Sequence, residues 1–176
     1  MKPRYFIPIL LAVFLLHSGF GREATKKKEV QKQIDALNHT VQEAANKGEL
    51  QKAITAAEDV LDLAKKEFGD SSIEAAKAMN NVANLYLFIG HPTDAERLYK
   101  DSIILEVTKY GNDNVEIADS LYNLGMAYAM QKKYGEALKM VDRVLKIRKE
   151  KLGANHPETL KAQEMATTLW KESTGQ

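Results

Sequence analysis

The stretch Gly69–Gly111 reads GDSSIEAAKAMNNVANLYLFIGHPTDAERLYKDSIILEVTKYG, and the rest of the chain repeats its pattern. It contains a turn, an amphipathic helical pattern, a short break at GHPT, and a second helical pattern that ends at a glycine. Matching residues recur 42 positions later, as in the pairs Gly69 and Gly111, Ala95 and Ala137, and Tyr86 and Tyr128. A fixed period of this length is typical of repeat architectures. The sequence therefore predicts an all-α array of stacked helical pairs.

Four short segments carry a resemblance to a known family: NNVANLY (80–86), YNLGMAY (122–128), KYGEAL (133–138) and LGANHPET (152–159). They resemble the tetratricopeptide repeat (TPR) in the 42-residue form found in kinesin light chains. The resemblance covers roughly Glu29 to Lys171. It implies a TPR-type right-handed solenoid of helical hairpins, with repeats at about 29–69, 70–111 and 112–153. A capping helix at 155–172 and a tail at 173–176 complete the expected array.

Each later unit opens with a helix-start signal, in which a capping residue precedes a glutamate by three positions. These pairs are Ser71 with Glu74, Asp113 with Glu116, and Asn155 with Glu158. In the last helix, Trp170 occupies the position of Tyr86 and Tyr128, so we expect its ring to face inward.

The N-terminus has the organisation of a signal peptide at 1–21. Lys2 and Arg4 precede an apolar run, 5–16, and small residues at Gly19 and Gly21 suggest cleavage near Gly21. We expect export, to a periplasm or out of the cell, and a basic linker at 22–28. The alternative is an N-terminal membrane anchor, although the apolar run is shorter than the roughly 18 residues that a spanning helix needs.

The composition excludes several classes of function. The chain has 25 basic and 24 acidic residues, so no charge excess favours binding to nucleic acid or, for the mature chain, to a membrane. It contains no cysteine, and its histidines do not occur at metal-ligand spacing. No phosphate-binding loop or nucleophile motif is present. We therefore expect a protein that is not an enzyme and needs no cofactor or metal.

The remaining candidate is a binding surface. The resemblance implies that the first helix of each pair lines a concave groove and contacts the ligand. On this basis the predicted contact residues are Asn81, Asn123, Asn84, Lys77, Asn80 and Tyr122. Asparagine side chains can both donate to and accept from an extended peptide backbone. The alternative is that these asparagines tie neighbouring helices together. His39 stands in the Asn81 position of the first unit and Asp119 in the Lys77 position of the third, so a complete basic clamp is absent.

Two functions remain open. The first is an exported scaffold or adaptor that holds a peptide segment or a partner protein in its groove. The second is an assembly factor that self-associates, or docks to an envelope complex, through the ends of the array. Met126, Met130 and Met140 are compatible with core packing or with an adaptable binding surface.

Overall fold

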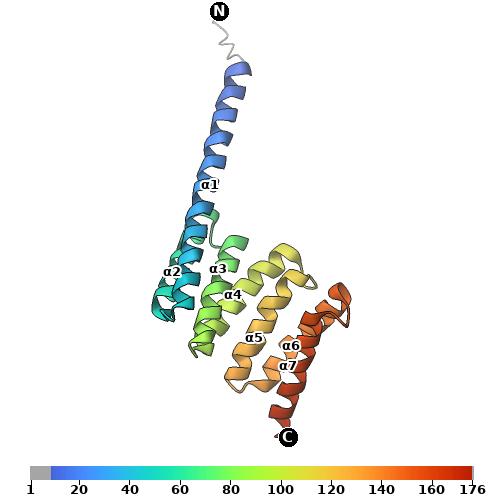
Figure 1. Ribbon diagram of the computed structural model, residues 1–176. Coiled ribbons are helices and arrows are strands. Elements are labelled where there is room, and N and C mark those ends of the chain that lie inside the picture. The colour runs from blue at the N-terminus through green and yellow to red at the C-terminus, as the bar shows by residue number, and fades with distance from the viewer. Residues whose placement is uncertain (1–8, 176) are drawn as a thin grey trace, which may run out of the picture.

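The computed structural model describes residues 9–175, and these form a row of stacked helices without a strand (Figure 1). The helices are α1 (Ile9–Asn46), α2 (Leu50–Phe68), α3 (Ile73–Phe88), α4 (Pro92–Tyr110), η1 (Val115–Ile117), α5 (Ala118–Met130), α6 (Tyr134–Leu152) and α7 (Pro157–Thr174). Helices α1 and α2, α3 and α4, and α5 and α6 pack as hairpins, and each second helix packs on the first helix of the next hairpin. The predicted all-α solenoid is therefore confirmed.

Small residues stand where the helices of a hairpin cross. Ala53, Ala95 and Ala137 are each fully buried, and they lie 42 residues apart in α2, α4 and α6. At Gly125 in α5, an added Cβ would lie only 3.3 Å from Val141 Cγ2. Close approach of the axes lets Tyr99, Leu121 and other large side chains fill the space between successive hairpins.

The first helices begin one residue later than the capping pattern predicts. The N-cap residues are Ser72, whose hydroxyl accepts from Ala75 N (3.1 Å), Asn114, which caps η1, and His156, whose Nδ1 accepts from Glu158 N (3.2 Å). Proline is favoured at the first helical position because the N–H group that it lacks would have no partner within the helix there. Pro157 therefore makes His156 the cap, and the 42-residue register extends this assignment to the other two units.

Glycines with positive φ angles end the helices. Gly69, Gly111 and Gly153 have φ between 85° and 97° and follow the second helices. Gly48 and Gly90 end the tight turns within the first two hairpins, with φ of 73° and 80°. The equivalent turn residue in the third hairpin is Lys132, with φ of 59°. Residues other than glycine adopt this left-handed backbone conformation at an energetic cost.

Helix α1 begins well before Glu29, where the repeat pattern starts, and its N-terminal half projects beyond the array (Figure 1). Residues 22–28 are helical, unlike the linker that we expected, because this segment contains no glycine or proline to end a helix. Lys26 Nζ lies 2.7 Å from Glu67 Oε2 on α2. Residues 1–8 of the expected signal peptide lie outside the described residues. Among the described helices, none is long and apolar enough to span a bilayer.

Helix α7 covers the third hairpin without a partner helix of its own. Ala162 and Leu169 are buried against the array, whereas the Trp170 side chain is 52% exposed. The prediction that Trp170 faces inward is therefore wrong. The equivalent Tyr128 is covered by the side chains of Lys100 and Lys133, whereas the positions 42 residues later are Asp142 and Gly175, which are too short to cover Trp170 in the same way.

Candidate functional site

The first helices α1, α3, α5 and α7 form one side of the array, which we call the first-helix face. Three hollows occur between neighbouring first helices on this face. The N-terminal hollow, of about 330 Å³, lies between α1 and α3 and is lined by Gln31, Ile34, Asn38, Val60, Ala64, Glu74, Lys77, Ala78 and Asn81. The central hollow, also about 330 Å³, lies between α3 and α5 and is lined by Ile73, Lys77, Asn80, Asn81, Glu106, Tyr110, Glu116, Asp119 and Ser120. The C-terminal hollow, of about 440 Å³, lies between α5 and α7 and is lined by Tyr122, Met126, Ala129, Met130, Lys161, Glu164, Met165, Thr168 and Leu169.

Lys77 and Asn81 occupy the ridge of α3 between two hollows. They lie one helical turn apart, both are exposed, and each lines the N-terminal and the central hollow. Neither side chain forms a hydrogen bond or an ion pair with the described residues. Their polar groups are therefore available to a ligand that crosses α3.

Asn80 has the opposite role, although it is the next residue to Asn81. Its Nδ2 donates to Glu106 Oε1 (2.8 Å) and to Ser120 Oγ (2.7 Å), and its Oδ1 accepts from Ser102 Oγ (2.6 Å). This network joins α3, α4 and α5. Asn80 therefore ties helices together, as the alternative interpretation of the asparagines proposed.

Asn84 and Asn123 contact each other across the face. Asn123 Nδ2 on α5 donates to Asn84 Oδ1 on α3 at 3.1 Å, and the buried Tyr99 hydroxyl donates to the same oxygen. The Asn84 amide nitrogen and the Asn123 carbonyl oxygen have no hydrogen bond within the described chain. This pair thus links two hairpins and retains one donor and one acceptor for a ligand.

Tyr122 lies at the edge of the C-terminal hollow beneath two cations. The Arg148 guanidinium and Lys161 Nζ lie 5.3 and 5.4 Å from its ring centre. Burial is the largest influence on the Tyr122 hydroxyl, and its pKa is raised. Met126 and Met130 are 38% and 50% exposed and line the same hollow. These two methionines therefore contribute to an open apolar surface in addition to any packing role.

Glu106 is a functional candidate that the sequence analysis missed. It is only 4% exposed, and no described residue donates a hydrogen bond to its Oε2. Burial raises the pKa of this carboxyl group, whereas hydrogen bonds from Ser120 and Asn80 act in the opposite direction. Its position on the buried stripe of α4, four residues after Ser102, could have revealed it, since charged residues are rarely buried without a partner.

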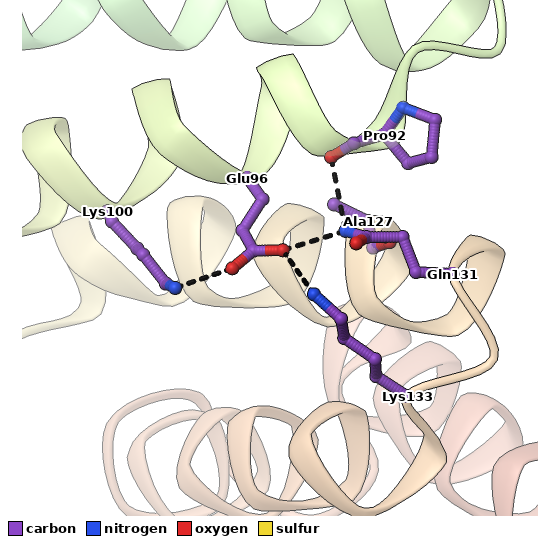
Figure 2. Close-up of polar contacts among 6 residues, drawn as sticks. All are labelled: Pro92, Glu96, Lys100, Ala127, Gln131 and Lys133. Atoms are coloured by element: carbon purple, nitrogen blue, oxygen red, sulfur yellow. Dashed lines mark hydrogen bonds and ion pairs between the residues drawn. The ribbon is translucent and has the colours of Figure 1, made fainter.

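A second polar cluster holds the second and third hairpins together (Figure 2). Glu96 on α4 accepts hydrogen bonds from Lys100 on its own helix, from Gln131 at 2.8 Å and from Lys133 at 3.0 Å. Burial raises the pKa of the Glu96 carboxyl, but these three hydrogen bonds outweigh it and lower the pKa to about 2. Both lysines also lie over the Tyr128 ring. The cluster is a joint between hairpins, because every donor is already paired with the glutamate.

Within the described part of the chain, no group of three or more histidine or carboxylate side chains is arranged to hold a metal ion. The first-helix face offers side-chain amides, the ammonium group of Lys77, carboxylates at the central hollow and exposed methionines at the C-terminal hollow, which are groups suited to binding a polypeptide chain.

Two models of the tetratricopeptide repeat family match the chain, over residues 44–103 and 117–158. Together they span more than half of its length. No curated protein matches it significantly.

Solved structures show the same fold. A kinesin light chain of Podospora anserina with nearly identical TPR-like repeats is 18% identical, with a TM-score of 0.71, over 83% of this chain and 67% of that one. BtubC (BKLC) from P. vanneervenii is 20% identical, with a TM-score of 0.72, over 80% of this chain and only 56% of its own length. The TPR2B domain of yeast Sti1, solved as a complex with pHsp70, is 16% identical, with a TM-score of 0.57, over 82% of this chain and 99% of that domain.

The fold is thus that of a protein–protein interaction scaffold. Its exact repeat spacing, its alanine crossings and the family models agree, and the chain belongs to the tetratricopeptide repeat family, with repeats like those of kinesin light chains.

Proposed function

We propose that the chain is an exported scaffold that binds an extended segment of a partner protein along its first-helix face. The observation that carries this proposal is the ridge formed by Lys77 and Asn81. These two side chains stand between two hollows and have no hydrogen-bond partner in the described chain. A peptide that crosses α3 could bond both of them while placing side chains in the hollows on either side.

The likeness to peptide-bound TPR structures supports this arrangement only as a comparison, since the Sti1 domain was solved with pHsp70. The export part of the proposal rests on the signal-peptide pattern at 1–21. It predicts that the protein isolated from its native host begins near Arg22, which N-terminal sequencing would test.

The groove is tested by selecting random peptides that bind the full chain and measuring their affinity for two variants. In the first, Lys77→Ala is combined with Asn81→Ala. The matched control is Lys139→Ala, which removes an exposed lysine from α6. Two hydrogen bonds of about 0.5–1.5 kcal/mol each predict roughly a tenfold to hundredfold loss for the double variant and no change for the control. Equal affinity for all three proteins would contradict the proposal.

A specific observation favours a second function, which is self-association through α7. Leu160 and Trp170 are 51% and 52% exposed, yet the equivalent residues Ala118 and Tyr128 of α5 are buried. α7 therefore exposes large apolar side chains at positions that are buried in α5, and α7 of a second copy could cover them.

The only tryptophan in the sequence reports directly on this surface. Acrylamide quenches an exposed indole, so quenching of Trp170 should fall as protein concentration rises if α7 is an interface. Analytical ultracentrifugation of the wild type and Leu160→Gln gives the matching measurement. A monomer with concentration-independent quenching would exclude this second function.

A further inference from the structure

We propose that the central hollow binds a guanidinium group, supplied by an arginine side chain of the segment that occupies the first-helix face. This inference rests on the proposed function, because the bound segment would carry the arginine. It adds a requirement on the bound segment, which must contain an arginine. The ridge formed by Lys77 and Asn81 does not impose this requirement.

The unpartnered oxygen of Glu106 is the first observation. Glu106 lines the central hollow and is 96% buried, a position in which an acceptor without a donor is costly. Its Oε1 accepts from both Asn80 and Ser120, whereas Oε2 has no donor among the described residues. Asn80 and Ser120 thus hold the carboxylate in place, and its second oxygen is left without a donor in the described chain.

The charge around the hollow is the second observation. Glu116 and Asp119 line it together with Glu106, and Lys77 is the only basic residue in its lining. Glu116 is exposed at the rim and has no ion-pair partner among the described residues. Asp119 is already paired with Arg148, so Glu106 and Glu116 are two carboxylates without an ion-pair partner in the described chain against the one ammonium group of Lys77, and this excess favours a cationic guest.

The chain itself shows that a guanidinium fits this kind of joint. Arg148 lies 42 residues after Glu106, in the equivalent slot of α6, and is 2% exposed. Its NH2 group lies 2.6 Å from Asp119 Oδ1 and 3.3 Å from Glu158 Oε2, and its NH1 group donates to the Glu158 carbonyl oxygen at 2.9 Å. The joint between α5 and α7 thus contains its own guanidinium. The joint between α3 and α5 has the carboxylate and lacks the guanidinium.

Arginine fits better than lysine for a physical reason. A guanidinium has five N–H donors in a plane and can bond a carboxylate while pointing other donors at neighbouring acceptors. The central hollow is lined by two residues that carry such acceptors, Glu106 and, at the rim, Glu116. An ammonium group is a compact point charge that is more strongly hydrated, so its transfer from water into the hollow is less favourable in free energy.

Lys77 is a cation of the chain itself that could compete with an external guanidinium for the Glu106 carboxylate. It holds the position in α3 that Asp119 holds in α5, so Lys77 and Glu106 repeat the Asp119 and Arg148 pair with the charges exchanged. In the structure, however, Lys77 is exposed and forms no ion pair with Glu106. Removing its charge should therefore strengthen the binding of an external cation.

The test uses three small probes with the full chain: N-acetyl-arginine amide, N-acetyl-lysine amide and N-acetyl-citrulline amide. Citrulline has the shape of arginine without its charge. Binding is followed by NMR through the side-chain amide signals of Asn80, with Asn123 as a reference outside the hollow. We expect saturable shifts at Asn80 with the arginine probe, at least threefold weaker binding of the lysine probe, and none with citrulline.

Two variants make the result specific. Glu106→Gln keeps the shape and removes the charge, and it should weaken the arginine probe at least tenfold while the melting temperature is retained or raised. Lys77→Met should strengthen it. Equal shifts with citrulline, or unchanged binding to Glu106→Gln, would overturn the inference. So would arginine binding only to Lys77→Met, because Lys77 would then already neutralise Glu106 in the native chain.

The two proposals fail separately. If selected peptides bind through Lys77 and Asn81 but the arginine probe does not shift Asn80, the guanidinium inference alone is wrong. If the arginine probe binds but no peptide depends on the ridge, the hollow is a small-cation site and the scaffold proposal is wrong.

Discussion

Asn80 and Asn81 show how much the surroundings of one residue type can differ between neighbours. Asn80 forms three hydrogen bonds with side chains of α4 and α5, whereas Asn81 forms none within the described chain. Sequence alone places both on α3 and identifies both as candidate contacts. It cannot show which of the two amides faces the next helix. Adjacent residues point about 100° apart around the helix axis, so only one of them can do so.

This difference makes a direct prediction about stability. Asn80→Ala should lower the free energy of unfolding by about 1–3 kcal/mol, because Ser102 and Glu106 lose a buried partner. Asn81→Ala should change it by less than about 0.5 kcal/mol, as is usual for an exposed substitution. Urea denaturation of the two variants measures both values. Equal losses would mean that Asn81 also ties helices together.

Lys132 gives a second prediction at this scale. It stands with φ of 59° in the turn position that Gly48 and Gly90 occupy in the first two hairpins. Lys132→Gly should raise the free energy of unfolding by about 0.5–1 kcal/mol, because glycine adopts this conformation without strain. The matched change Lys139→Gly, in the exposed interior of α6, should lower it by about 1 kcal/mol. If both substitutions were destabilising, the turn would impose no strain on Lys132.

At the scale of the elements, the joint around Glu96 makes a prediction about pH (Figure 2). Folding lowers the pKa of Glu96 from 4.5 to about 2, so the ionised form is the one that stabilises the fold. The stabilisation is complete above pH 4.5 and is lost as the pH falls towards 2. It is worth about 2 kcal/mol after allowance for solvent screening.

Glu96→Gln should therefore be less stable than the wild type at pH 7, and the difference should disappear near pH 2. Glu136→Gln, on the exposed surface of α6, serves as the control and should show little difference at either pH. Urea denaturation at the two pH values makes the comparison. A difference that is the same at both pH values would mean that the charge of Glu96 does not hold the joint.

The helices could largely be predicted from sequence, because the 42-residue repeat and the positions of glycine and proline indicate the local backbone geometry. The helix pairs, their order and the alanines at their crossings follow from the 42-residue spacing. The outward position of Trp170 and the burial of Glu106 could not be predicted in this way. Both depend on which side chains of neighbouring helices reach a given position, and that is not fixed by the local sequence pattern.

At the scale of the whole molecule, stability should be distributed along the array rather than concentrated in one core. Each hairpin contacts only its neighbours, so local changes should have local effects. Helix α7 covers α6 at one end, where it buries Ala162 and Leu169.

A chain that ends at Gly153 should consequently lose amide protection first in α5 and α6, while α3 and α4 keep most of theirs. The expected loss of stability is about 2–5 kcal/mol, from apolar surface that α7 no longer covers. Hydrogen exchange measured by mass spectrometry resolves the helices separately. Gln163→Ala, on the exposed side of α7, is the control and should leave protection unchanged. A uniform loss along the chain would indicate one cooperative unit.

The opposite charges at equivalent slots have a consequence for how such a protein could be lengthened or rearranged. If the second hairpin were duplicated in tandem, the backbone spacing would accept the new unit. Glu106 of the first copy, however, would then face the equivalents of Ser120 and Asp119 in the second copy, which are Ala78 and Lys77. It would lose a hydroxyl donor and gain an ammonium group. The backbones of the hairpins are thus similar enough to exchange places, but the side chains at the joints are complementary only in the native order of the units.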